Sequence, residues 1–147
     1  MTIRFARPDD LPAVVELCQM HAEYERAEYD PTGKVEALQQ QFFSARPSAY
    51  CLLVEQDDQI LGYATYALQF STWDADHYVY MDCLFVREGA RSNGIGEQLM
   101  NRIKMEARAM GCNLIQWQTP DFNVRAIKFY ERIGAMGKSK ERFFLDV

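Results

Sequence analysis

The chain has little positive charge, few cysteines and no long hydrophobic run. Its 16 Lys and Arg stand against 21 Asp and Glu, which gives a formal net charge of −5 over 147 residues. Proteins that bind nucleic acid displace counterions with clustered basic side chains, so this balance argues against a nucleic-acid partner. A modest acidic excess is common among soluble enzymes, and it also suits a cationic substrate.

No hydrophobic stretch reaches the length of a membrane span, and the first residues lack the apolar core and cleavage site of a signal peptide. The cysteines, at positions 18, 51, 83 and 112, have neither the pairwise spacing of a metal site nor the density of a secreted disulfide scaffold. With 48% hydrophobic residues, the chain is long enough for one core. We therefore expect one cytoplasmic domain over residues 1–147, with free, mostly buried thiols, no metal and no membrane contact.

Hydrophobic periodicity predicts a mixed α/β domain without internal repeats. Strands are expected at residues 3–6, 50–55, 60–68, 78–86, 114–118 and 142–146, with a hairpin turn at residues 56–59. Helices are expected over residues 11–22, 35–42, 95–107 and 123–133. The last helix has Asn123 as its candidate N-cap, and Gly111 and Gly134 end the last two helices.

Residues 86–96 join a strand to an amphipathic helix and contain an arginine and two glycines next to the helix start. A helix N-terminus presents unpaired backbone N–H groups and the positive end of the helix dipole, so it binds anions readily. Gly94 and Gly96 remove the Cβ atoms that would keep an anion away, and Arg91 adds a permanent cation. The segment is therefore predicted to bind phosphate.

Two glycines alone would instead shape a loop or a tight contact between helix and strand. The arginine, the preceding strand and the following helix favour anion binding over that alternative. A Rossmann dinucleotide site fits less well, because it needs three glycines as G-x-G-x-x-G after the first strand. A nucleoside-triphosphatase loop does not fit, because no Gly-Lys-Ser/Thr follows.

A second informative segment covers residues 123–135, with the sequence Asn-Val-Arg-Ala-Ile-Lys-Phe-Tyr-Glu-Arg-Ile-Gly-Ala. Asn123 and Tyr130 are separated by about two helical turns, so they point to a similar side of the helix. Taken alone, Tyr130 would fit an ordinary aromatic core position.

Together the two segments resemble the GNAT superfamily of N-acetyltransferases. Val86, Arg91, Gly94 and Gly96 match the coenzyme A pyrophosphate motif Val-x-x-x-x-Arg-x-x-Gly-x-Gly, and the second segment matches Asn-x-x-Ala-x-x-Phe-Tyr-x-x-x-Gly. The order of elements is similar along the whole chain. The resemblance implies a single GNAT-type α/β domain, with a mixed, mostly antiparallel central sheet, about four flanking helices and splayed central strands.

The resemblance also implies acetyl-coenzyme A as cosubstrate and no metal. The pantetheine arm would bind along the strand at residues 84–86, and the pyrophosphate would bind where the third long helix starts. One departure is Ser92, where close relatives have glycine. The residues implied to contact the cofactor are Leu84, Phe85, Val86, Arg91, Ser92, Asn93, Gly94, Ile95, Gly96, Glu97, Asn123, Ala126, Phe129 and Tyr130.

In the family the tyrosine of the second segment, here Tyr130, acts as general acid. A phenol with a pKa of about 10 can protonate a thiolate whose conjugate acid has a pKa of about 8.5, if the two lie within hydrogen-bond reach. Backbone N–H groups near Leu84 and Phe85 would stabilise the oxyanion that forms when an amine attacks a thioester directly in a ternary complex.

The reaction also needs a base, because a primary amine with a pKa of about 10.4 must lose a proton before it attacks. Asp82 is the candidate, either directly or through a water molecule. Strand alternation predicts that it shares a mostly apolar face with Tyr80, Leu84 and Val86, where a carboxylate needs a partner or a function. An ion pair with Arg or Lys is an equally open role for Asp82.

Within the superfamily, residues 22–26, 70–73 and 80–86 resemble the diamine acetyltransferases of the spermidine/spermine type. In that family the residues corresponding to Tyr24, Glu25 and Asp82 face the polyamine. Acidic residues gather where the first helix ends and would attract a dication, although a solvated helix face is an equally good explanation. These residues are Glu23, Glu25, Glu28 and Asp30.

Two departures from that subfamily leave the acceptor amine open. Its Glu-Asp pair on the strand is Asp82-Cys83 here, and its Trp-Asn before the last helix is Phe122-Asn123. Lysine-like amines, a protein amine, an aminoglycoside, or a non-catalytic acetyl-coenzyme A sensor remain alternatives. Cys83 is expected to be a buried thiol, and neither histidine is assigned a role.

The resemblance implies a homodimer. The aromatic pair Phe143-Phe144 in the expected last strand would suit pairing across it, although a strand covered by its own chain would have the same sequence.

Overall fold

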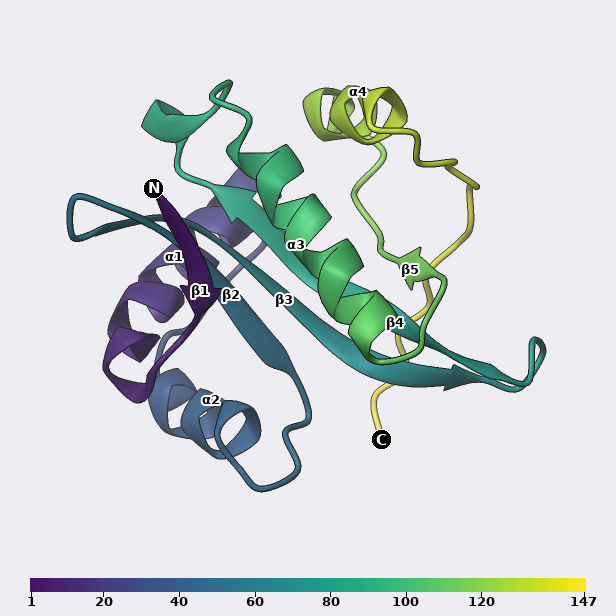
Figure 1. Cartoon of the computed structure of the whole chain (residues 1–147), viewed down its shortest axis with the longest axis horizontal. Helices are drawn as coiled ribbons and strands as arrows, with labels where there is room; N and C mark the ends of the chain where they lie inside the picture. Colours follow the sequence, from purple (N-terminus) through teal and green to yellow (C-terminus); the bar gives the residue numbers. More distant parts are fainter.

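Five strands form one mixed sheet in the order β1-β2-β3-β4-β5 in the computed structural model, which describes residues 1–147 (Figure 1). Neighbours from β1 to β4 are antiparallel, whereas β5 runs parallel to β4. The strands are β1 (Thr2–Phe5), β2 (Tyr50–Gln56), β3 (Gln59–Ser71), β4 (Asp76–Val86) and β5 (Ile115–Gln116). Asp57 and Asp58 turn the β2–β3 hairpin with positive φ angles of 52° and 61°, as a tight two-residue turn requires.

Four α-helices flank the sheet: α1 (Leu11–Tyr24), α2 (Lys34–Phe42), α3 (Ile95–Ala109) and α4 (Val124–Arg132). Short 3₁₀ turns occur at Pro8–Asp10 and Glu88–Ala90. The helices α1 and α2 lie on one face of the sheet and α3 lies on the other, with α4 on the α3 side (Figure 1). The predicted fold class, a mixed and mostly antiparallel sheet with four helices, is confirmed.

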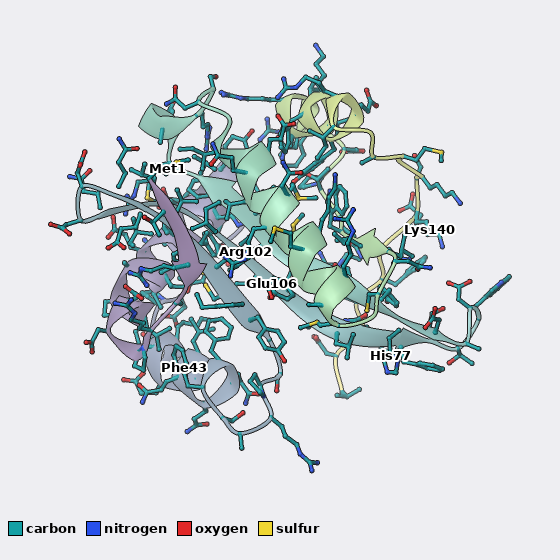
Figure 2. All side chains as sticks on the ribbon, viewed as in Figure 1. Met1, Phe43, His77, Arg102, Glu106 and Lys140 are labelled. Atoms are coloured by element: carbon teal, nitrogen blue, oxygen red, sulfur yellow. The ribbon has the colours of Figure 1, made fainter.

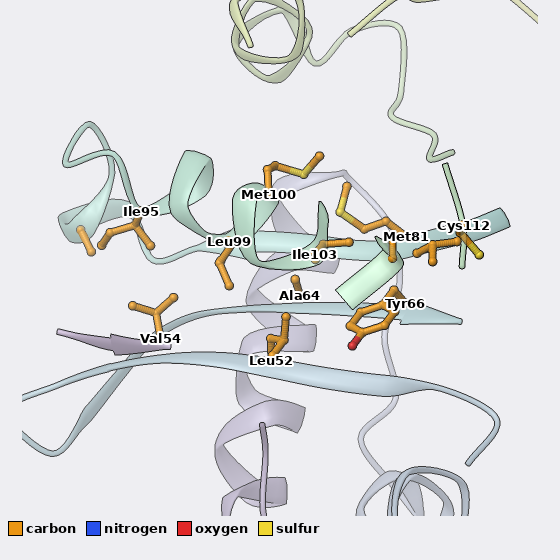
Figure 3. Close-up of a cluster of buried hydrophobic side chains, with 13 residues drawn as sticks. Leu52, Val54, Ala64, Tyr66, Met81, Ile95, Leu99, Met100, Ile103 and Cys112 are labelled. Carbon is orange, nitrogen blue, oxygen red and sulfur yellow. The ribbon is translucent and has the colours of Figure 1, made fainter. Parts of the chain in front are cut away.

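The core between α3 and the sheet follows the predicted helical stripe. Leu99 and Ile103 are fully buried, and in Figure 3 Leu99 points toward Leu52 and Val54 of β2 and Ala64 of β3. Burying a leucine or isoleucine side chain stabilises a fold by about 2 kcal/mol. This packing therefore fixes the position of α3, and with it the start of that helix beside β4.

A second core lies under α1. Leu11, Val14 and Leu17 pack against Leu53 and Tyr63 of the sheet, all of them almost completely buried. Because α1 and α3 pack on opposite faces, residues at the end of α1 and at the start of α3 approach the same end of β4 from two sides.

The outer side of α3 is polar and is tied to the first strand. Arg102 Nε donates to Glu106 Oε1 at 2.7 Å, one helical turn away, and Arg102 Nη1 donates to the backbone oxygen of Ile3 at 3.2 Å (Figure 2). A pair one helical turn apart contributes only a few tenths of a kcal/mol, so the main effect of this half-buried pair is to orient its side chains.

β4 and β5 separate soon after they meet. Their pairing consists of Val79 with Ile115 and Tyr80 with Gln116, and β4 then continues to Val86 with no partner on that side. The splayed central strands implied by the family resemblance are present. The predicted strand 114–118 is therefore limited to two residues, because its neighbour diverges from it.

The predicted last strand at residues 142–146 is wrong. Residues 135–147 have no regular secondary structure, and Phe143, Phe144 and Leu145 are 89%, 79% and 91% exposed. A strand needs a neighbour to satisfy its backbone groups, and no strand of this chain pairs with the segment. Its apolar residues thus remain on the surface of the monomer.

A one-residue bulge interrupts β4 at Asp82. The pairing with β3 passes from Thr65–Cys83 to Tyr66–Met81, which leaves Asp82 without an opposite residue. An extra residue of this kind shifts the alternation of side chains along the strand.

The bulge overturns the prediction that Tyr80, Asp82, Leu84 and Val86 share one face. The β4 side chains that pack toward α3 are Val79, Met81, Leu84 and Val86. Cys83 packs with Phe85 on the α1 side, away from Met81. Asp82 itself lies between these two halves of the strand, and its side chain is exposed.

The four cysteines are free, with Cys51 and Cys112 buried and Cys18 and Cys83 half-buried. Burial raises the pKa of the Cys83 thiol to about 12, so it stays protonated at neutral pH. A protonated thiol is a poor nucleophile, which agrees with the expectation that Cys83 is a core residue.

Candidate active site

A cavity of about 690 Å³ opens where β4 and β5 separate. Its walls come from the end of α1, the bulged half of β4, the start of α3, residues 117–119 and α4. Of the residues predicted to bind cofactor or amine, all except Asn93 line this one cavity. The fold thus gathers residues from widely separated parts of the chain, while their binding roles remain predictions.

The N-terminus of α3 faces the cavity without a capping side chain. Its first backbone hydrogen bond joins Gln98 N to Gly94 O at 3.1 Å, and no side chain caps the helix. The N–H groups of Ile95, Gly96 and Glu97 have no backbone partner. Because all three residues line the cavity, a diphosphate bound there would meet unpaired amides and the positive end of the helix dipole.

The two glycines of the motif have different physical roles. Gly94 has a φ of +73°, which an L side chain rarely adopts, and a Cβ there would meet nothing within 4 Å. Gly96 has no such conformation, but a Cβ there would lie 3.2 Å from Cζ of Phe129 on α4. Gly94 therefore shapes the loop, and Gly96 allows α4 to pack closely against α3. Gly96 thus has a packing role in addition to the predicted one, and its contact with an anion remains a prediction.

Arg91 extends along β4. Its Nε donates to the backbone oxygen of Val86 at 2.9 Å, and its guanidinium lies over the rings of Tyr24 (4.6 Å) and Phe85 (5.3 Å). The cation is therefore already inside the cavity, held by a carbonyl of the unpaired β4 edge.

Asn93 turns out of the cavity. Its side-chain amide donates to the backbone oxygen of Ala90 at 3.3 Å, so it braces the loop. The hydrogen bond joins two residues of the same loop. The cofactor contact expected for Asn93 came from the family motif alone, and the position of the side chain does not support it.

Ser92 has a left-handed backbone with a φ of 69°, a conformation that glycine adopts without strain. We expect Ser92→Gly to be more stable than Ser92→Ala by about 1 kcal/mol, because only glycine removes the strain. Both variants lose the weak bond from Arg125 Nη2 to Ser92 Oγ (3.2 Å), so their difference isolates the backbone. Urea unfolding of the two variants measures it, and equal midpoints would show that the residue is unstrained.

Asn123 precedes α4 at the N-cap position, yet its side chain does not cap the helix. Its Oδ1 accepts a hydrogen bond from the Tyr24 hydroxyl at 2.9 Å, and its Nδ2 donates to Thr119 Oγ1 at 3.0 Å. The predicted cap is thus wrong, because these partners occupy the side chain. Asn123 instead links the end of α1 to the start of α4 across the cavity.

Tyr130 lines the cavity from α4, with its ring edge-on to Trp117 at a centroid distance of 5.1 Å. Burial, and then the charges of Glu25 and Tyr24, raise the pKa of its phenol to about 12. The hydroxyl therefore keeps its proton at neutral pH, as a general acid must.

Three carboxylates line the cavity: Glu25 from the end of α1, Asp82 from the bulge and Glu97 from the first turn of α3. Asp82 forms no ion pair, so the alternative that it pairs with Arg or Lys is not realised. Of the predicted acidic cluster, only Glu25 reaches the cavity, whereas Glu23, Glu28 and Asp30 are exposed outside it.

Sequence reasoning missed several residues of the cavity. His21 contacts Glu25 from one turn earlier on α1, a spacing visible in the sequence. Three cations line the wall formed by α4, and their spacing of three and four residues marks one helix face. They are Arg125, Lys128 and Arg132.

No group of three or more His, Cys, Asp or Glu side chains that could hold a metal ion is present. No helix combines the length and hydrophobicity needed to cross a membrane.

An uncapped helix start beside an unpaired strand edge, with a half-buried tyrosine across the cavity, suits a protein that binds a phosphorylated carrier and transfers its group. The model of the acetyltransferase (GNAT) family matches residues 14–135. The chain therefore belongs to the GNAT acetyltransferase family and is an acetyl-transferring enzyme.

Named relatives extend over most of the chain. Bovine (Bos taurus) thialysine N-epsilon-acetyltransferase is 28% identical, with 90% of this chain and 82% of the relative covered. Human (Homo sapiens) spermidine/spermine N(1)-acetyltransferase-like protein 1 is 25% identical over 95% of this chain and 21% of its own length. A crystal structure of a probable acetyltransferase superposes with a TM-score of 0.83, covering 100% of this chain and 98% of the other at 22% identity, which supports the fold.

Proposed function

We propose that the chain transfers the acetyl group of acetyl-coenzyme A to a primary amine of a small molecule that is a diamine, a polyamine or a lysine-like amine. One observation carries the proposal: a protonated tyrosine and the carboxylates of Glu25 and Asp82 line the same cavity as the free amides of α3. The relatives named for thialysine and for spermidine/spermine support an acceptor with a primary amine and further charge.

The cavity offers groups of the right kind for acetyl-coenzyme A. The free amides of α3, with the cations Arg91 and Arg125, would hold the diphosphate. The unpaired edge of β4 at residues 84–86 would offer backbone groups to the pantetheine arm. When bound, acetyl-coenzyme A supplies the acetyl group as an activated thioester.

Residues of the chain would accept and donate the protons of the reaction and stabilise its oxyanion. Asp82, exposed and free of ion pairs, accepts a proton from the substrate ammonium through a water molecule, so that the nitrogen can attack directly in a ternary complex. Backbone N–H groups near Leu84 and Phe85 stabilise negative charge on oxygen. Tyr130 would give the proton of its hydroxyl to the leaving sulfur, and the second proton lost by the nitrogen would restore the phenol.

A panel of amines tests the proposal, with thiol release from acetyl-coenzyme A as the readout. The panel contains a diamine, a polyamine, lysine, thialysine, a monoamine, an aminoglycoside and a peptide with a free amine. We expect the highest kcat/KM with a diamine, polyamine or lysine-like compound. Preference for the aminoglycoside or the peptide would replace the proposed acceptor class. Absence of thiol release with every amine would favour a sensor that binds acetyl-coenzyme A without catalysis.

We also propose that the protein is a cytoplasmic homodimer. The exposed apolar residues of the C-terminal segment, among them Phe143 and Phe144, are the surface that supports dimerisation. Replacing both phenylalanines by serine should shift the protein from dimer to monomer, because the change removes apolar area from the expected interface. Light scattering coupled to size-exclusion chromatography measures the mass, and a wild-type monomer at micromolar concentration would contradict the proposal.

A further inference from the structure

His21 contacts a carboxylate that faces the substrate side of the cavity. Its Nε2 lies 2.6 Å from Glu25 Oε2, and its Nδ1 lies 3.0 Å from the hydroxyl of Tyr63. The imidazole also stacks on Phe85 with a centroid distance of 5.3 Å. Its side chain is only 14% exposed, so the ring is fixed from three directions.

The hydrogen bonds of His21 have a definite direction. An ionised carboxylate only accepts, so Nε2 carries the hydrogen and donates it to Glu25. In a neutral imidazole Nδ1 is then an acceptor, and the Tyr63 hydroxyl is its donor. Tyr63 is 1% exposed, and burial raises its phenol pKa well above the ordinary value, so the donor keeps its hydrogen.

Glu25 has one oxygen that the protein leaves free. Oε2 is bound by His21, while Oε1 has no hydrogen-bond or ion-pair partner in the chain. Glu25 lines the same cavity as Asp82 and Tyr130, and its charge is near enough to influence the Tyr130 phenol. A substrate ammonium close to the reacting centre would therefore meet Oε1.

On the basis of the proposed function, we propose that His21 is a positioning residue for the amine substrate. It holds Glu25 so that Oε1 faces the cavity and accepts the substrate ammonium, and Tyr63 fixes the ring of His21 from the core. The ligand class is a small primary amine that is charged at neutral pH. Asp82 keeps its separate part as proton acceptor.

His21→Leu tests the proposal, because leucine keeps apolar contact with Phe85 but cannot orient Glu25. We expect KM for a diamine to rise about tenfold, with kcat and KM for acetyl-coenzyme A changed by less than about twofold. The dissociation constant of the diamine, measured by calorimetry, should rise by the same factor. His21→Gln should restore most of the affinity, because an amide can donate to Glu25 and accept from Tyr63.

The other histidine provides a matched control. His77 lies at the β3–β4 hairpin against Phe70, outside the cavity, and Figure 2 shows it on the arm of the molecule that is remote from α1. His77→Leu should leave every kinetic constant unchanged.

Tyr63→Phe tests the second contact through a double-mutant cycle. The phenyl ring preserves the core, and Tyr63 does not line the cavity, so any effect on the amine must pass through its neighbours. We expect a smaller rise in diamine KM, about threefold, and no further rise when Tyr63→Phe is added to His21→Leu. If His21→Leu fails to fold, the single variants Tyr63→Phe and His21→Gln still test the inference, because the first should raise the diamine KM and the second should keep most of the affinity.

Two results would overturn the inference while leaving the proposed function intact. One is an active wild type whose diamine affinity is unchanged in His21→Leu. The other is equal loss of affinity for diamine and for acetyl-coenzyme A, which would indicate general damage. A wild type that acetylates no amine would instead contradict the proposed function itself.

Discussion

Phenylalanine at position 130 should lower kcat by about 100-fold or more while leaving the affinity for acetyl-coenzyme A within about twofold. The ring of Tyr130 packs edge-on against Trp117 and lies 5.3 Å from Phe129, and a phenyl ring keeps both contacts. What the variant loses is a hydroxyl that burial keeps protonated, with a pKa of about 12. Thiol-release kinetics measure kcat, and calorimetry measures cofactor binding.

The same pKa fixes the direction of the pH dependence. In the proposed mechanism the protonated phenol is the active form, so activity that depends on it is retained at lower pH and is lost as pH rises through about 12. Wild-type kcat should therefore show no fall caused by this group between pH 7 and 10.

Tyr50→Phe is the matched control for Tyr130→Phe. Tyr50 is half-buried and stacks on Tyr66 outside the cavity, so its variant should keep full activity. A Tyr130→Phe enzyme that retained more than half of wild-type kcat would show that another group, or water, protonates the leaving thiol.

Valine at position 94 should weaken binding of coenzyme A by about 30-fold. The φ of +73° at Gly94 is strained for any side chain, and valine is among the least tolerant residues there. The loop must then leave its conformation and turn the first amides of α3 away from the diphosphate. Several charge-assisted hydrogen bonds would be lost or weakened at once. Calorimetric titration with coenzyme A measures the change.

The chain contains its own control for this experiment. Gly33 precedes α2 with the same φ of +73°, has no atom within 4 Å of its Cβ position, and lies outside the cavity. Gly33→Val should therefore cost a similar free energy of unfolding without changing cofactor affinity. Equal weakening of binding by both variants would mean that the effect is general instability and would remove the support for a phosphate site at α3.

Elements with a strong internal pattern were predictable from the sequence. The stripe containing Leu99 and Ile103 defined α3, and the polar pair Asp57-Asp58 defined the hairpin turn. The last strand was mispredicted because Phe143 and Phe144 have β-forming side chains but no neighbour within the chain. Strand propensity is local, whereas pairing depends on the rest of the molecule.

The site was predictable where it depends on motifs and not where it depends on contacts. Gly94, Arg91 and Tyr130 were found through their spacing, and all three line the cavity. His21 was missed because its role depends on a contact with Tyr63, a residue 42 positions away in the sequence. Asn123 was assigned a cap for the same reason, since its real partner Tyr24 is 99 positions away.

Asp82 is the bulge residue of β4, and the numbering of the side chains that face α3 changes at this residue. Before Asp82 the odd-numbered side chains pack toward α3, and after it the even-numbered ones do. Deleting Asp82 would restore regular pairing, with Met81 opposite Tyr66 and Cys83 opposite Thr65, and would leave Leu84 and Val86 on the α3 side. We expect such a variant to keep the sheet intact and to lose only the carboxylate that the bulge adds to the cavity wall. The extra residue thus adds a charged group at this point without changing the faces of the residues around it.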